Sequence, residues 1–150
     1  MNILLTGSAG FIGMHTAERL LARGDTVIGF DNLNDYYDVS LKHARLTRLQ
    51  AHPNYIHITA DLADRAAVEA VFETHRPQRV IHLAAQAGVR YSKENPHVYA
   101  SSNLTGFLHI LEGCRHHGVA HLVFASTSSV YGGNTRMPYT ETESTEHPLT

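Results

Sequence analysis

The first thirteen residues constrain the fold more than any other part of the chain. A short apolar run from Asn2 to Thr6 leads directly into three glycines spaced three apart, Gly7, Gly10 and Gly13, and a helical pattern follows. Glycine allows backbone conformations closed to other residues and leaves no Cβ between the main chain and whatever lies against it. We therefore expect Gly7 to make a tight turn, Gly10 to let the backbone approach a ligand, and Gly13 to let the helix pack closely.

The start of this helix is a predicted anion site. Unpaired N–H groups and the positive end of the helix dipole lie together at a helix N-terminus, and a diphosphate binds well there. The spacing is GxxGxxG rather than the dinucleotide fingerprint GxGxxG. Glycines that serve only the packing of the helix are the alternative interpretation.

The rest of the chain alternates between strand-like and helix-like segments. We expect strands at 2–6, 26–30, 55–59, 79–84 and 121–125, and helices at 11–23, about 37–50, 64–75 and about 96–117. Alternation of this kind, with continuously apolar strands, is typical of a parallel sheet with helices on both faces. The sequence therefore predicts an α/β protein with a doubly wound parallel sheet, and its 150 residues suit one domain.

Composition argues against several classes of protein. The formal net charge of -2 gives no basic field for nucleic acid or an anionic membrane surface. No apolar run approaches the length of a membrane span, and a strand that starts at residue 2 leaves no room for a signal sequence. The single cysteine, Cys114, excludes an internal disulfide, and the densest histidines, His116, His117 and His121, lack the spacing of a metal site. We expect a soluble cytoplasmic protein with no metal, no nucleic-acid partner and no membrane partner.

Two acidic residues end neighbouring strands. Asp31 lies eighteen positions after Gly13, where a carboxylate can accept hydrogen bonds from both hydroxyls of an adenosine ribose. Such a carboxylate repels a 2′-phosphate, and no Arg or Lys lies between Arg23 and Lys42 to bind one, so the sequence favours NAD over NADP. A turn residue is the alternative for Asp31. Asp61, at the end of the third strand, could bind the adenine or could cap the next helix.

Small residues follow the last two strands. Ala84 and Ala85 leave space at the carboxyl edge of the sheet, where doubly wound folds bind ligands, although core packing explains them equally well. The fifth strand runs into "ASTSS" at 125–129, in which four of the five residues carry a hydroxyl. Hydroxyls at this edge can donate to a sugar oxygen, and a polar turn is the alternative.

Together these motifs resemble the extended short-chain dehydrogenase/reductases that modify nucleotide sugars. The matching segments run the whole chain in order: the three glycines, "DNL" at 31–33, "DL" at 61–62, "HLAA" at 82–85, Asn103 and "STSSVYG" at 126–132. Within that family, "DNLNDYYDVSLK", "AAQAGVRYS" and "VYGGNTRMPY" are similar to the 4-epimerases of UDP-glucuronate. The resemblance implies a Rossmann-type fold, tightly held NAD, a UDP-sugar substrate and a homodimer.

The resemblance also implies a reaction and roles for residues. A hydride leaves C4 of the sugar for NAD⁺, and the resulting 4-keto sugar rotates and receives the hydride on its other face. Thr127 matches the hydroxyl partner of the sugar 4-oxygen, Ser128 and Ser129 lie beside it as substrate contacts, and Arg90 approaches the nucleotide sugar. Asn103 matches a helix residue near the active site, with a solvated asparagine as the alternative. The positions expected to contact the cofactor are Gly7, Gly10, Phe11, Ile12, Gly13, Asp31, Asn32, Asp61, Leu62, Ala84, Ala85 and Asn103.

Position 129 helps to separate relatives within the family. Sugar-nucleotide dehydratases and UDP-glucuronate decarboxylases usually carry a glutamate there, as the acid/base group of their additional steps. Ser129 cannot act as that base near neutral pH, so oxidation followed by simple re-reduction fits better. A decarboxylase or dehydratase relative, and a dinucleotide-binding module without catalysis, are the alternatives.

The chain departs from the family at the catalytic base. The base is the tyrosine of a YxxxK motif, and here no tyrosine is followed four residues later by lysine. In the family this tyrosine comes shortly after a stretch like "EHPLT", which occupies 146–150. We interpret residues 1–150 as the N-terminal portion of an NAD-binding domain, inactive alone, without the substrate domain. We also expect an exposed apolar stripe at Leu104, Phe107 and Leu111, because the helix that covers it in the family dimer is missing.

Overall fold

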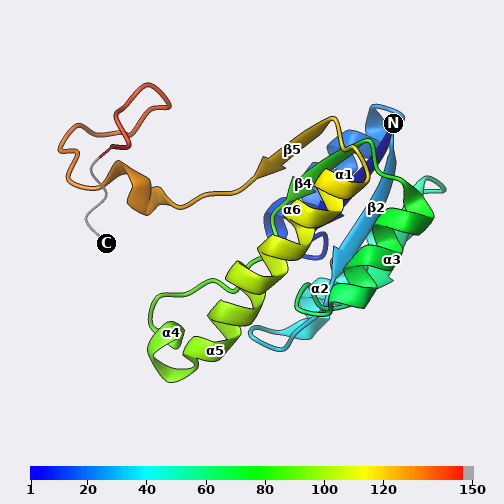
Figure 1. Ribbon diagram of the computed structural model, residues 1–150, viewed down its shortest axis with the longest axis horizontal. Coiled ribbons are helices and arrows are strands. Elements are labelled where there is room, and N and C mark those ends of the chain that lie inside the picture. Colours follow the sequence, from blue (N-terminus) through cyan, green and yellow to red (C-terminus); the bar gives the residue numbers. More distant parts are fainter. Residues whose placement is uncertain (147–150) are drawn as a thin grey trace.

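Five parallel strands form one sheet, in the order β3-β2-β1-β4-β5. The computed structural model describes residues 1–146 (Figure 1). The strands are β1 (Asn2–Thr6), β2 (Thr26–Asp31), β3 (Tyr55–Thr59), β4 (Arg79–His82) and β5 (His121–Phe124). At the carboxyl end of the central strand, Thr6 of β1 lies opposite Phe30 of β2 on one side and His82 of β4 on the other. The chain first winds from β1 toward β3 and then crosses to β4, so a crevice opens at the carboxyl end of β1.

Helices connect the strands as the sequence predicts. They are α1 (Phe11–Ala22), α2 (Val39–Gln50), α3 (Arg65–His75), α4 (Tyr91–Glu94), α5 (Pro96–Tyr99) and α6 (Gly106–His116), with a π-helical segment at Ala100–Thr105 and a 3-10 turn at Ser128–Tyr131. Predicted element ends agree to within two residues. The long helix predicted near 96–117 is present as α5, the π-helical segment and α6. The short α4 and the 3-10 turn are not predicted by the sequence.

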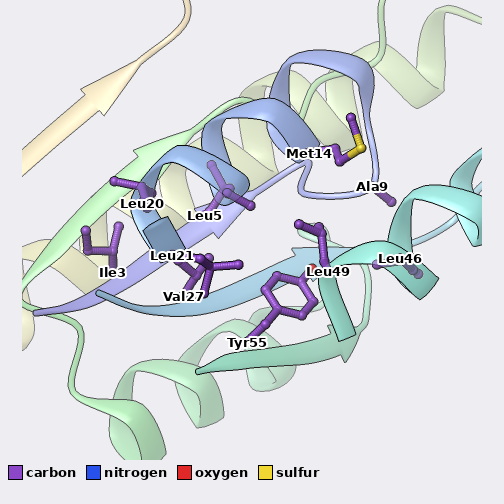
Figure 2. Packing of buried hydrophobic residues seen from close by; sticks show 11 residues of the cluster. Ile3, Leu5, Ala9, Met14, Leu20, Leu21, Val27, Leu46, Leu49 and Tyr55 are labelled. Atoms are coloured by element: carbon purple, nitrogen blue, oxygen red, sulfur yellow. The ribbon is translucent and has the colours of Figure 1, made fainter. Parts of the chain in front are cut away.

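The sheet has a hydrophobic core on each face. One core packs α1 and α2 against the sheet (Figure 2) and consists of Ile3, Leu5, Ala9, Met14, Ala17, Leu20, Leu21, Val27, Leu46, Leu49 and Tyr55. The other packs α3 and α6 and consists of Leu4, Ile28, Phe30, Leu62, Val68, Val71, Phe72, Val80 and Ile110. Residues of β1 alternate between the two cores, as side chains of a strand must. The doubly wound α/β fold with helices on both faces is therefore confirmed.

The side of the molecule around β5 is less covered. Val123 and Phe124 of β5 are about half exposed. After β5 the chain, orange to red in Figure 1, runs away from the sheet. Leu104, Leu108 and Leu111, on the long helix, are also exposed. In the described part of the chain no helix has the length and apolarity to cross a membrane.

Candidate functional site

A cleft of about 320 Å³ lies at the carboxyl ends of β1, β2, β3 and β4. Parallel strands place their following loops along this edge, which is where ligands bind in doubly wound folds. Eight positions predicted to contact a cofactor line it: Gly7, Gly10, Asp31, Asn32, Asp61, Leu62, Ala84 and Ala85. They come from four separate loops, so the fold brings together residues up to 78 positions apart in the sequence.

The glycine loop between β1 and α1 has the geometry that its spacing predicts. Gly7 has a φ of 70°, and a Cβ there would lie 2.8 Å from the backbone nitrogen of Ala84. A Cβ on Gly13 would lie 2.0 Å from the carbonyl oxygen of Gly7, so only glycine lets α1 approach the loop this closely. Gly10 is the N-cap of α1 and lines the cleft. The tight turn and the close packing are both present, and the cleft lies against bare main chain.

Asp31 fixes the shape of the glycine loop. Its side chain is largely buried, and Oδ2 accepts a hydrogen bond from the Ala9 N–H at 3.0 Å. Oδ1 accepts from the Leu33 N–H at 2.9 Å. Asp31 is thus a turn residue as well as a cleft residue, and the two interpretations are compatible. An ionised carboxylate has about four acceptor positions, so capacity for ribose hydroxyls remains.

Asp61 faces the cleft together with Asn32. Its Oδ2 accepts from Asn32 Nδ2 at 2.9 Å, and its Oδ1 accepts from the Ala63 N–H at 2.8 Å. The N-cap of α3 is instead Asp64, whose side chain accepts from the Ala67 N–H. The helix-capping alternative for Asp61 is therefore wrong, because the helix begins too late to need it.

Thr6 and His82 form a buried polar pair beneath the loop after β4. Thr6 Oγ1 accepts from the N–H groups of Leu83 and Ala84 at 3.2 and 3.1 Å and lies 2.8 Å from His82 Nδ1. With both acceptor positions in use, the hydroxyl hydrogen must go to Nδ1, which requires a neutral ring. Burial lowers the pKa of His82 to about 4, and the ring stacks on Phe107. No pattern in the sequence indicates this pair, which holds the backbone of two cleft residues.

Lys42 also lines the cleft, although it lies eleven positions after Asp31 in the sequence. Its side chain is buried, and Nζ donates to both the carbonyl oxygen and Oδ1 of Asn34 at 2.7 Å. Burial lowers the pKa of this amine, and the charge of Asp31 opposes that shift. A cation does therefore lie beside the predicted ribose site. The absence of a nearby cation no longer favours NAD over NADP, and that preference depends on the Asp31 carboxylate alone.

Asn103 acts on the cleft through a neighbour. Its Oδ1 accepts from the Gln86 N–H at 2.8 Å, and its Nδ2 donates to the Gln86 carbonyl oxygen at 3.0 Å. Gln86 and Ser102 line the cleft. Asn103 lies in the π-helical segment, a conformation frequent at functional sites. The solvated-asparagine alternative is wrong, while direct contact of Asn103 with a cofactor stays a prediction.

Several predicted positions lie outside the cleft. Phe11 and Ile12 begin α1 with 66% of each residue exposed, and Arg90 is exposed at the start of α4. Thr127, Ser128 and Ser129 are exposed in the segment after β5 that leaves the sheet (Figure 1). Their roles stay predictions. The stretch "EHPLT" lies outside the described residues except for its first, Glu146.

The cleft has lining residues that sequence reasoning missed. They are Phe30, Asn34, Tyr36, Tyr37, Lys42, Ala60, Leu83, Gln86, Ala87 and Ser102. Tyr36 packs against Tyr91, so the loop after β2 contacts the segment after β4. The letters "NDYYD" were a usable signal, because two aromatic residues in a polar loop suggest a contact surface. Within residues 1–146 no cluster of His, Cys, Asp or Glu side chains is arranged to hold a metal ion.

Known proteins with similar sequences and structures match almost the whole chain. A profile of the GDP-mannose 4,6-dehydratase family matches residues 4–149. The chain is 54% identical to an uncharacterised 37.6 kDa protein in the cld 5′ region of Escherichia coli O111:H-, over 99% of this chain and 44% of that protein. It is 49% identical to the UDP-glucuronate 4-epimerase of Thermodesulfobacterium geofontis, over 97% of this chain and 45% of that enzyme.

A solved structure supports the same comparison. A variant of the UDP-glucuronic acid 4-epimerase of Bacillus cereus, crystallised with UDP-4-deoxy-4-fluoro-glucuronic acid and NAD, superposes with a TM-score of 0.82 at 30% identity. The match covers 95% of this chain and 45% of that one. The chain thus spans less than half the length of the relatives it matches.

Proposed function

Because the chain belongs to the GDP-mannose 4,6-dehydratase family, we propose that it is the cofactor-binding part of an NAD-dependent nucleotide-sugar 4-epimerase. We assign UDP-glucuronate as the substrate and UDP-galacturonate as the product of the whole protein. The observation that carries the proposal is the cleft, in which one loop from each of four strands supplies residues suited to a dinucleotide. The similarity to two 4-epimerases of UDP-glucuronate supports the choice of sugar.

The residues of the cleft fit NAD. Gly10 and the N–H groups that begin α1 would hold the diphosphate, which needs close approach to main chain and a positive helix end. Asp31 would accept hydrogen bonds from the adenosine ribose, and Asn32 with Asp61 would border the adenine. Ala84 and Ala85 would leave space for the other half of the cofactor. NAD, when bound, supplies an acceptor and then a donor of hydride at the sugar.

Residues of the segment after β5 would hold the sugar. We assign the Thr127 hydroxyl to a hydrogen bond with the 4-oxygen, which orients the C–H bond that is broken and formed again. Ser128, Ser129 and Arg90 would contact the rest of the UDP-sugar. Ser129 in place of a carboxylate leaves that position without a general base for elimination or decarboxylation, which favours epimerisation.

The exposed face of the long helix supports a homodimer of the whole protein. Leu104, Leu108 and Leu111 are spaced three and four apart, so they share one helix face, and all are exposed. Apolar residues gathered in this way mark an interaction surface. Phe107, which the sequence placed in the same stripe, is instead partly buried against His82 and Phe124.

The test is to incubate the full-length protein with UDP-glucuronate and NAD⁺ and to separate the products by chromatography. We expect UDP-galacturonate. Release of CO₂ with formation of UDP-xylose would support a decarboxylase instead, and NAD⁺ binding without turnover would support a binding module. Either result would overturn the proposal.

A variant locates the chemistry. Thr127→Val should lower kcat on the order of 100-fold while leaving the affinity for NAD⁺ unchanged, because the hydroxyl acts on the sugar. Thr47→Val, on the exposed side of α2, is the matched control and should keep full activity. A Thr127→Val enzyme as active as the control would exclude the assigned role.

A further inference from the structure

Arg45, on α2, reaches the glycine loop of the cleft. Its guanidinium NH1 donates to the carbonyl oxygen of Ala9 at 3.2 Å, across 36 positions of sequence. Ala9 lies between Gly7 and Gly10 and is fully buried. Its N–H is bonded to Asp31, as described above. Both polar groups of this one residue are therefore held by charged side chains, one from β2 and one from α2.

The direction of the Ala9 carbonyl group affects how well the glycine loop can bind an anion. A loop binds phosphate through N–H groups, and a carbonyl oxygen turned toward the phosphate would repel it. The bond from Arg45 holds the Ala9 carbonyl toward α2, and the guanidinium adds a positive charge beside the loop. A hydrogen bond from a charged donor is about twice as strong as one between neutral groups, so the orientation is well fixed.

Arg45 also connects the glycine loop with the loop after β2. Its NH1 donates to the Tyr37 hydroxyl at 3.0 Å, and the guanidinium carbon lies 5.8 Å from the centre of that ring. Lys42, one turn earlier on α2, lies 4.7 Å from the same ring centre. Tyr37 lines the cleft. One face of α2 thus braces two of the loops that form the cleft.

We propose that Arg45 is a positioning residue for the diphosphate of the cofactor. It fixes the Ala9 carbonyl and Tyr37, so that the glycine loop presents N–H groups to the phosphates. The inference goes beyond the proposed function, which assigns no role to α2, and it rests on that function because it needs a dinucleotide in the cleft.

The neighbouring arginine provides a matched control. Arg48 lies on the same helix and also ties α2 to α1, through a 2.6 Å ion pair with Glu18. It makes no contact with the glycine loop in the described residues. Substitution of Arg48 therefore removes a helix contact of similar kind without touching the cleft.

The experiment compares Arg45→Met, Arg45→Lys and Arg48→Met in the full-length protein freed of nucleotide. Binding of ADP-ribose is measured by calorimetry and binding of adenosine by ligand-observed NMR. Arg45→Met should bind ADP-ribose about ten-fold more weakly, equivalent to about 1.4 kcal/mol. Adenosine, which lacks the diphosphate, should bind as it does to the wild type. Arg45→Lys should recover part of the loss, and Arg48→Met should stay within about two-fold of the wild type.

Three outcomes would overturn the inference. Arg45→Met could bind ADP-ribose as the wild type does, it could lose adenosine in equal measure, or Arg48→Met could lose ADP-ribose to the same extent. The last two would indicate general damage to the fold or the cleft. A wild-type protein that binds neither ligand would instead refute the proposed function, and so the two failures are distinguishable.

Discussion

Acidification should destabilise the protein through His82. The ring is buried and hydrogen-bonded to the Thr6 hydroxyl, and its pKa falls from 6.5 to about 4 on folding. Below pH 6.5 the unfolded chain takes up a proton at this residue while the folded protein does not. The free energy of unfolding is therefore complete above pH 6.5 and decreases as the pH falls toward 4.

The size of the effect follows from the two pKa values. At pH 4.5 the unfolded ring is almost fully protonated and the folded ring is mostly neutral, so this residue lowers the free energy of unfolding by about 2–3 kcal/mol. That is a large fraction of the stability of an ordinary domain. Protonation of the folded protein would also place a hydrogen on Nδ1, where the Thr6 hydroxyl already donates one. The loss of this hydrogen bond is a structural reason why protonation of the folded protein is unfavourable.

The assay is denaturant unfolding of the wild type and His82→Asn at pH 7.0 and pH 4.5. Asparagine keeps an acceptor near Nδ1 and cannot titrate. The variant should be less stable at pH 7.0, because stacking on Phe107 is lost, but it should lose about 2–3 kcal/mol less than the wild type on acidification. His43→Asn, at an exposed position, should lose as much as the wild type. If His82→Asn and the wild type lose equal amounts, the reasoning is wrong, since every other histidine is common to both.

Three further predictions concern packing, the cofactor and assembly. Gly13→Ala should destabilise the chain by roughly 3 kcal/mol or more and abolish NAD⁺ binding, because a Cβ would lie 2.0 Å from the Gly7 carbonyl oxygen; unfolding midpoints and calorimetry check this. Asp31→Asn should weaken NAD⁺ binding at least ten-fold in a binding titration, because the single amide oxygen replaces only one of the two carboxylate oxygens that accept from the Ala9 and Leu33 N–H groups, and the NH₂ group cannot accept. Residues 1–150 alone should self-associate in light scattering, and Leu108→Gln should reduce the association; a clean monomer of the unsubstituted chain would contradict this.

The fold was predictable because its signals are local. Continuous apolar runs, helical periodicity and the glycine spacing each lie within a single segment of the chain, and they give the order of elements almost without error. The middle of the long helix is the exception. Residues 100–105 form π-helix, and the apolar spacing of a helix carries no information on whether its bonds span four or five residues.

Sequence reasoning found the residues of the site only where a single residue in or beside the loop after a strand suggests a chemical role by its type. Asp31 and the glycines are of this kind. Lys42 is not, because its place in the cleft depends on how α2 packs, and Thr6 meets His82 only because β1 pairs with β4 across 76 positions. For Asp61 the sequence left two roles open, and the start of α3 at Arg65 excludes the capping role, while contact with the adenine stays a prediction.

Buried polar side chains hold the loops that form the cleft. Among the described residues, Asp25 binds the N-terminal amine and Arg23 at the amino end of β2, and the other buried polar residues lie in the cleft or beside it. These are Thr6, Ser8, Asp31, Lys42, His82 and Gln86. A polar group in the interior is unfavourable unless it is hydrogen-bonded, and each of these six side chains has a partner in a loop or at a strand end. Loops fixed in advance lose little conformational entropy when a ligand binds, so more of the contact energy remains as affinity. Substitutions in this network should therefore weaken cofactor binding even where the fold survives.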